Sequence, residues 1–175
     1  MGKDELEEIV TKWLIEEGFT IKKLDPRFPI KVVWGLEVRT PPPLNVGFRV
    51  FKPQLRPDRL VLMLGVAISP EHLRELERLD EGKRFKFFSR LLLELIKVCN
   101  TCNVVIEPSP FNPRGITATL TLLEDHVKSS GKQGLLNEIY KILNVFIAII
   151  SYFNEVFPHV TLTKLKGREG VVRSL

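Results

Sequence analysis

The feature that most constrains this chain is an apolar helix near its C-terminal end, between Gly134 and Pro158. At roughly 100° per residue, its large apolar side chains fill an arc of about 200°, whereas a surface helix needs an apolar stripe of about 100°. One sheet can cover only part of that arc, so the segment predicts assembly with a partner or capture of a ligand. The apolar positions are Leu135, Leu136, Ile139, Ile142, Leu143, Val145, Phe146, Ile147, Ile149, Ile150, Phe153, Val156 and Phe157.

Part of this arc is the candidate interaction surface. Contiguous exposed apolar patches larger than a few hundred Å² usually mark interaction sites. We expect the partner to be a second copy of the chain, giving a homodimer, or a protein or peptide client. The residues expected to form the surface are Leu143, Phe146, Ile147, Ile150, Phe153 and Phe157.

The terminal helix is not expected to cross a membrane. Its longest stretch without a charge, from Ile142 to Asn154, has 13 residues, and a membrane span needs about 20. The opening segment, with Lys3, Asp4 and Glu5, is charged and has no apolar signal region, so no secretion signal is expected. We therefore expect a cytoplasmic protein. The chain has only two glutamines, Gln54 and Gln133, among many Lys, Arg and Glu residues, which leans toward a thermophilic source.

Periodicity divides the rest of the chain into helices and strands. Ser69-Pro70-Glu71 is a strong helix start, because it combines a capping hydroxyl, a proline in the first turn and an acid near the helix dipole. The apolar run from Leu60 to Ile68 predicts a central strand buried on both faces. The prolines between Pro108 and Gly115 predict a loop. Helices are expected over 4–17, 70–79, 84–98 and 135–157, and strands over 30–38, 46–50, 60–68, 104–106 and 116–122, after a short extended piece at 19–24.

This order predicts an α+β fold: an antiparallel sheet of about five strands with helices packed on it, in the order α-β-β-β-α(α)-β-β-α. Residues 4–157 form a single domain and residues 158–175 a basic C-terminal tail. In the helix that starts near Arg84, we expect a buried face that includes Phe85. The other residues expected on that face are Phe88, Leu91, Leu92, Leu95 and Ile96.

The element order resembles the fold of type III secretion chaperones. The run from Leu60 through Ser69-Pro70-Glu71 to Leu76 is also similar to a family of small uncharacterised archaeal proteins with that fold. The resemblance implies a dimer or a protein-binding surface rather than an active site. It transfers no functional residue to this chain.

The net charge of +5 raises the alternative of RNA or single-stranded nucleic-acid binding. Lys164, Lys166, Arg168 and Arg173 against one acid, Glu169, give the tail a net charge of +3, so the domain itself is close to neutral. Affinity driven by phosphates needs many clustered cations. The sequence region that would add to the tail is the basic stretch with Arg49, Lys52, Arg56 and Arg59.

The one motif of chemical interest is Cys99-Asn100-Thr101-Cys102. It closes a helix instead of opening one, and the helix dipole at that end disfavours a thiolate, so redox catalysis is not expected. Metal binding across a dimer, a local disulfide and two free cysteines remain open. The three histidines have no nucleophile motif beside them, and we expect no catalytic residue, no cofactor and no resident metal.

Overall fold

The computed structural model describes residues 4–160, which form four helices and six strands. The basic tail of residues 158–175 lies almost entirely outside this range. The helices are α1 (Glu5–Glu16), α2 (Pro70–Arg78), α3 (Glu81–Val98) and α4 (Glu124–Val156). The strands are β1 (Thr20–Lys23), β2 (Val32–Arg39), β3 (Gly47–Pro53), β4 (Arg59–Ala67), β5 (Asn103–Ser109) and β6 (Asn112–Leu123).

The strands form one antiparallel sheet in the order β1-β2-β3-β4-β6-β5, which confirms the α+β class. The sheet has six strands where about five were expected. The additional strand is β1, which the sequence showed only as a short extended piece. It pairs with β2 through Ile21 opposite Val38 and forms one edge of the sheet, while β5 forms the other.

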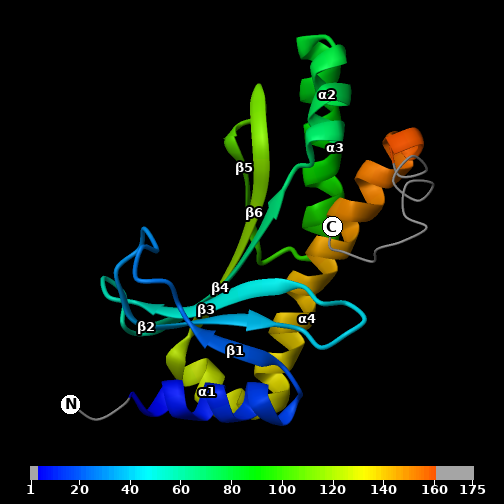
Figure 1. Ribbon diagram of the computed structural model, residues 1–175. Helices are drawn as coiled ribbons and strands as arrows, with labels where there is room; N and C mark the ends of the chain where they lie inside the picture. The colour runs from blue at the N-terminus through cyan, green and yellow to red at the C-terminus, as the bar shows by residue number, and fades with distance from the viewer. Residues whose placement is uncertain (1–3, 161–175) are drawn as a thin grey trace.

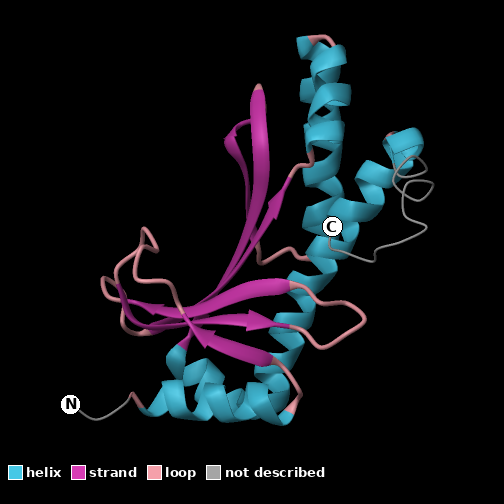
Figure 2. Cartoon of the chain, in the orientation of Figure 1, coloured by secondary structure: helices cyan, strands magenta, loops and turns pink. Residues whose placement is uncertain are grey.

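The helices lie on one side of the sheet (Figures 1 and 2). Figure 1 shows α1 below β1, β2 and β3, and α4 running past the middle of the sheet toward α2 and α3. The sheet bends between β3 and β4, so that β4, β6 and β5 stand at an angle to the first three strands. No described helix covers the opposite face, which we call the open face.

The open face corrects the prediction that β4 is buried on both sides. Leu60, Leu62 and Leu64 face the helices and are fully buried. Val61 and Met63 point to the other side and are only half-buried. The uninterrupted apolar run therefore marks a strand with one covered and one partly exposed face.

The helix starts follow the side chains that cap them. The hydroxyl of Ser69 accepts a hydrogen bond from the backbone N–H of His72, and Pro70 is the first residue of α2, as predicted. Asp80 caps α3 by accepting from the N–H of Lys83 at 2.8 Å. The break between α2 and α3 therefore falls at Leu79–Asp80, at the start of the gap expected between the helices 70–79 and 84–98.

The predicted loop between Pro108 and Gly115 is wrong, because this segment is the tip of a β-hairpin. β5 and β6 pair as far as Ser109 opposite Asn112. A register shift between Glu107 and Pro108 accommodates the proline, which cannot donate a ladder hydrogen bond. The prolines limit how the strands pair, but they do not end the hairpin.

Helix α4 begins earlier than expected, at Glu124, and bends at Gly131. Gly131 has φ 66°, in the left-handed region that favours glycine. The segment before this residue therefore lies at an angle to the long segment after it. Lys128 pairs with Glu5 at 3.1 Å and Lys132 with Glu17 at 2.6 Å, so both segments are tied to α1.

The long segment of α4 supplies much of the core. By length and composition it is apolar enough to cross a membrane. In the fold, however, its most apolar side packs on β4 and β6 and against α3. The buried positions after Gly131 are Leu135, Leu136, Ile139, Ile142, Leu143, Val145, Ile149 and Phe153. The packing is therefore that of a core helix.

A buried lysine joins three distant parts of the chain. Lys52 of β3 is 7% exposed on the helix side of the sheet. Its Nζ lies 2.8 Å from Asp4, the cap of α1, and 2.7 Å from Glu124, the first residue of α4. Removing one partner from such a group leaves charge of one sign without compensation. The ion triad Asp4–Lys52–Glu124 therefore holds α1, the sheet and α4 together.

We expect Lys52→Met to lower the free energy of unfolding by roughly 2 kcal/mol, less than for a fully buried pair because water reaches both carboxylates. Urea denaturation at neutral pH measures the loss. Lys23→Met, which removes an exposed lysine of β1, serves as the matched control and should change stability little. Equal losses in the two variants would contradict the role of the triad.

The effect of Lys52→Met should depend on pH. The hydrogen bond from Lys52 lowers the pKa of Glu124. Burial raises the pKa of Asp4, but the hydrogen bond and charge of Lys52 outweigh it, so this pKa is lowered too. Carboxyl groups of this kind stabilise the fold above their unfolded pKa and lose that contribution as the pH falls through the folded pKa. Denaturation at a series of acidic pH values should show the difference between wild type and variant shrinking.

Candidate functional site

The structure divides the six candidate residues of α4 into two groups. Leu143, Phe153 and Phe157 are buried within the subunit. Phe146 and Ile150 are half-buried, and only Ile147 is freely accessible, with 46% of its surface exposed. Three of the six side chains therefore cannot reach a partner in this conformation.

Aromatic side chains from α2 and α3 cover the end of α4. The ring of Phe87 lies 5.1 Å from that of Phe153 and 5.5 Å from that of Phe157. His72 of α2 packs on Phe153 at 5.1 Å. These contacts bury a part of the apolar arc that the sheet leaves uncovered, so much of the expected surplus is used inside the subunit.

Exposed apolar side chains gather instead along α3 and the β5–β6 hairpin. Phe85, Leu92 and Ile96 follow a spacing of seven and four residues, which places them on one stripe of α3. Phe85 stacks on Phe111 at the hairpin tip, with ring centroids 6.2 Å apart. This end of the stripe therefore meets the tip of the β5–β6 hairpin. We call the set Phe85, Leu92, Ile96, Val105 and Phe111 the edge surface; Leu92 is half-buried and the other four side chains are exposed.

The edge surface corrects the predicted orientation of α3. Phe85 and Ile96 were expected in the core, but they are 53% and 54% exposed. The helix is rotated so that Phe87 faces the aromatic end of α4. Both Phe85 and Phe87 lie in an apolar arc wider than one stripe, and helical periodicity alone does not determine which margin of that arc is buried.

The two sheet edges differ in how they are protected against pairing. β1 has only four residues, and two of them are lysines, which disfavour addition of another strand. On β5, the charge of Glu107 and the register shift at Pro108 protect only the hairpin end. No described strand pairs with the outer edge of Asn103–Ile106, so its backbone groups are available to a further strand.

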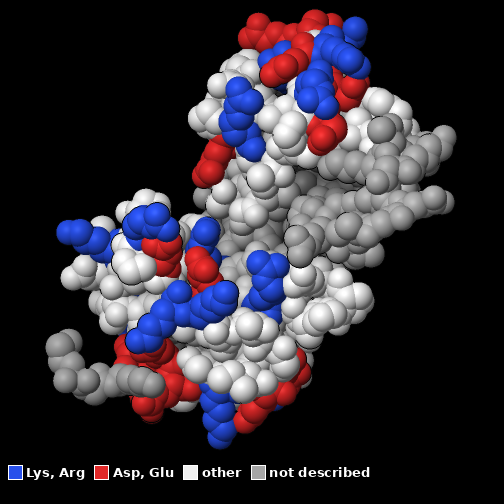
Figure 3. Space-filling model, in the orientation of Figure 1, with Lys and Arg blue, Asp and Glu red and all other residues white. Residues whose placement is uncertain are grey.

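The open face is hollowed next to the segment that joins β1 and β2 (Figure 3). A hollow of about 250 Å³ lies over β1, β2 and β3, and an adjoining one of about 660 Å³ lies between the β1–β2 segment and the β5–β6 hairpin. Glu37, Arg49 and Met63 line both hollows, which therefore form one groove. We call it the open-face groove.

Cations dominate the smaller hollow. Lys22, Arg39 and Arg49 line it together with one carboxylate, Glu37. Glu37 lies 3.9 Å from Arg49. The guanidinium of Arg39 donates to the backbone carbonyl of Asn45 at 3.1 Å. Among the described residues, neither Arg39 nor Lys22 has an ion-pair partner, so this end of the groove carries excess positive charge.

The four cations of β3, β4 and the turn between them that were proposed for nucleic acid do not form one patch. Lys52 is buried on the helix side in the ion triad, whereas Arg49 lies on the open face. Arg56 and Arg59 lie 3.9 and 3.6 Å from the carboxylate of Asp58. These cations are close in the sequence, which suggested a cluster. In the fold, Arg49 and Lys52 lie on opposite faces of β3, because side chains alternate along a strand.

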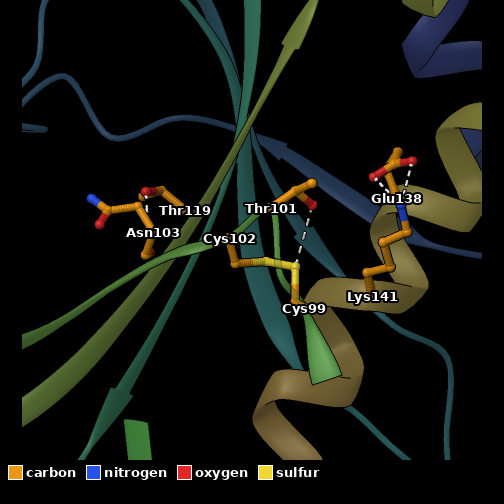
Figure 4. Close-up of a disulfide and its surroundings, with 7 residues drawn as sticks. All are labelled: Cys99, Thr101, Cys102, Asn103, Thr119, Glu138 and Lys141. Carbon is orange, nitrogen blue, oxygen red and sulfur yellow. Dashed lines mark hydrogen bonds and ion pairs between the residues drawn. A yellow bond between two sulfur atoms is a disulfide. The ribbon is translucent and has the colours of Figure 1, made fainter. Parts of the chain in front are cut away.

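Cys99 and Cys102 form a disulfide in the connection between α3 and β5 (Figure 4). The sequence left open metal binding across a dimer, a local disulfide and two free cysteines, and the structure has the local disulfide. The disulfide closes a turn just before the edge strand, and Cys99 is buried. Within residues 4–160, no group of three or more His, Cys, Asp or Glu side chains is placed to hold a metal ion.

We expect Cys99→Ser/Cys102→Ser to lower the free energy of unfolding, because the disulfide restricts the unfolded chain. The loss should be only about 2 kcal/mol, since the closed loop is very short. Thermal denaturation with and without a reductant measures the effect. Reductant should lower the melting temperature of the wild type to that of the double variant and leave the double variant unchanged. A wild type insensitive to reductant would contradict a disulfide in solution.

Comparisons with known proteins identify the fold. A family model described as "Uncharacterized conserved protein (DUF2299)" matches residues 6–153. The structure is similar to the crystal structure of an uncharacterized protein from Methanothermobacter thermautotrophicus, with a TM-score of 0.75 and 18% sequence identity. The similarity covers 87% of this chain and 99% of the archaeal one. No curated protein matches the sequence. The resemblance to secretion chaperones stays a prediction.

Proposed function

The chain belongs to the DUF2299 family of uncharacterized conserved proteins, and we propose that it is a non-enzymatic protein-interaction module that acts as a homodimer. The observation that carries this proposal is the edge surface. It combines an open strand edge with exposed aromatic and aliphatic side chains on both sides of that edge.

An open strand edge gives affinity through backbone hydrogen bonds, and the flanking side chains give specificity. Exposed apolar groups beside such an edge are an aggregation hazard unless a partner covers them. Ile96 and Phe111 are each more than half exposed, although the same subunit buries most of the apolar arc of α4. This contrast supports a partner at β5 rather than at α4.

A second copy of the chain fits the edge surface. Two identical strands that pair antiparallel are related by a two-fold axis, so the contact closes and does not propagate. The contact would join two six-stranded sheets through residues Asn103–Ile106 and bring the Phe85–Ile96 stripes of two α3 helices together. The turn end of β5, with Glu107 and Pro108, would lie outside the paired region because it resists pairing.

The alternative function, RNA or single-stranded nucleic-acid binding, has less support. It requires several cations on one surface, whereas Lys52 is enclosed by Asp4 and Glu124. The contribution of the basic tail lies outside the described residues.

We expect the wild type to be a dimer and Ile96→Glu/Phe111→Glu to be a monomer by light scattering behind a sizing column at micromolar concentration. Each subunit would bring two carboxylates into the contact, where they would be desolvated without partners, and this opposes association. Because both side chains are exposed in the subunit, the variant should keep its fold, as circular dichroism would verify.

Leu55→Glu is the matched control. Leu55 is 91% exposed between β3 and β4, away from the edge surface, so this variant should remain a dimer. A wild type that is monomeric at these concentrations would refute the proposal, and so would a dimer that persists in the double variant.

A further inference from the structure

The open-face groove carries a second interaction site. We propose that it binds an extended peptide of a partner protein in which an acidic side chain is followed, two residues later, by an apolar one. This inference rests on the proposed role as an interaction module but not on the dimer contact, because every residue that lines the groove belongs to one subunit.

The positive charge of the smaller hollow indicates that the peptide has an acidic side chain there. Lys22, Arg39 and Arg49 face Glu37 alone in the smaller hollow, an excess of two positive charges. Glu37 is already close to Arg49. A carboxylate entering the hollow would gain charge-assisted hydrogen bonds from Lys22 and Arg39, which have no ion-pair partner among the described residues.

The space for this carboxylate comes from two glycines of the open face. Gly47 and Gly65 line the smaller hollow, where a larger side chain would fill it. A Cβ at Gly65 would meet no atom within 4 Å, so the backbone there is exposed to the hollow. An extended peptide can therefore lie close to β3 and β4.

The apolar lining of the larger hollow indicates that the peptide has an apolar side chain there. Phe28, Pro29 and Ile30 line its wall, and Met63 lies on its floor where the two hollows meet. In an extended chain, side chains two residues apart lie on the same side, about 7 Å from one another. If the acidic side chain of the peptide lies over Arg39, the side chain two residues further on lies beside Met63.

Acidic groups at the far end of the groove favour a peptide over nucleic acid. Asp25 and Glu107 line the larger hollow, and Arg27 is paired with Asp25 at 2.9 Å. A phosphate backbone crossing the whole groove would meet these carboxylates after passing the cations. A peptide with a single acidic position avoids them.

The test uses the full chain and the fluorescein-labelled peptide Gly-Ser-Glu-Ser-Leu-Ser-Gly in fluorescence anisotropy at low ionic strength. We expect saturable binding that weakens as salt is added, and roughly tenfold or greater loss of affinity in Lys22→Glu/Arg39→Glu, because charge complementarity becomes repulsion. Gly65→Leu places a side chain in the hollow at a position where the added Cβ meets no atom within 4 Å, and it should abolish binding. Arg74→Glu/Lys86→Glu on α2 and α3 is the charge-matched control and should bind like the wild type.

Several outcomes would overturn the inference. It fails if the acidic peptide does not bind, if the peptide with lysine in place of glutamate binds equally well, or if Gly65→Leu binds normally. If oligothymidylate binds instead and Lys22→Glu/Arg39→Glu abolishes this binding, the groove is a nucleic-acid site. A monomeric protein that binds the acidic peptide would refute the dimer and retain the groove, so the two proposals fail separately.

Discussion

The ion triad Asp4–Lys52–Glu124 fixes the arrangement on which the other surfaces depend. It joins the cap of α1 to β3 and to the first residue of α4, three positions far apart in the sequence. A lysine on the helix side of a sheet is tolerated only when its charge is compensated, so α1 and α4 must meet at this point. Gly131 then allows α4 to turn and run along the sheet, while Lys128 and Lys132 hold both of its segments to α1.

Because the helices are held on one side, the other side of the sheet remains uncovered. The open-face groove lies there, with glycines and charged side chains along the middle strands and the β1–β2 segment as its wall. The same arrangement leaves β5 as an edge strand, and an apolar stripe of α3 meets the tip of its hairpin. The edge surface and the open-face groove are therefore two consequences of covering a bent sheet from one side.

The predictions from periodicity were correct where one face of an element decides its burial. Alternation predicted strands over 30–38 and 116–122, in which Leu36, Val38 and Ile116 are buried, and Ser69-Pro70 marked the start of α2. Predictions failed where contacts with neighbouring elements decide whether a side chain is buried. The apolar run Leu60–Ile68 did not show that one face of β4 lacks a covering helix. The prolines near Pro108 predicted a loop where the chain forms a hairpin. The wide apolar arc of α3 did not show that Phe87 is buried and Phe85 is exposed. For the site, Ile147 was predicted and is exposed, but Phe153 and Phe157 are covered by Phe87, a contact across 65 or more residues.

By itself, the sequence determined the α+β class, the order of the elements and the presence of more apolar surface on α4 than one sheet can cover. These properties follow from local spacing, capping side chains and the arc that apolar residues occupy on a helix. Only the tertiary structure decided where that surplus is buried, that Lys52 is a core residue, and that Lys22, Arg39 and Arg49 share one hollow. These depend on strand pairing and on contacts between distant segments, for which a single sequence carries no local signal.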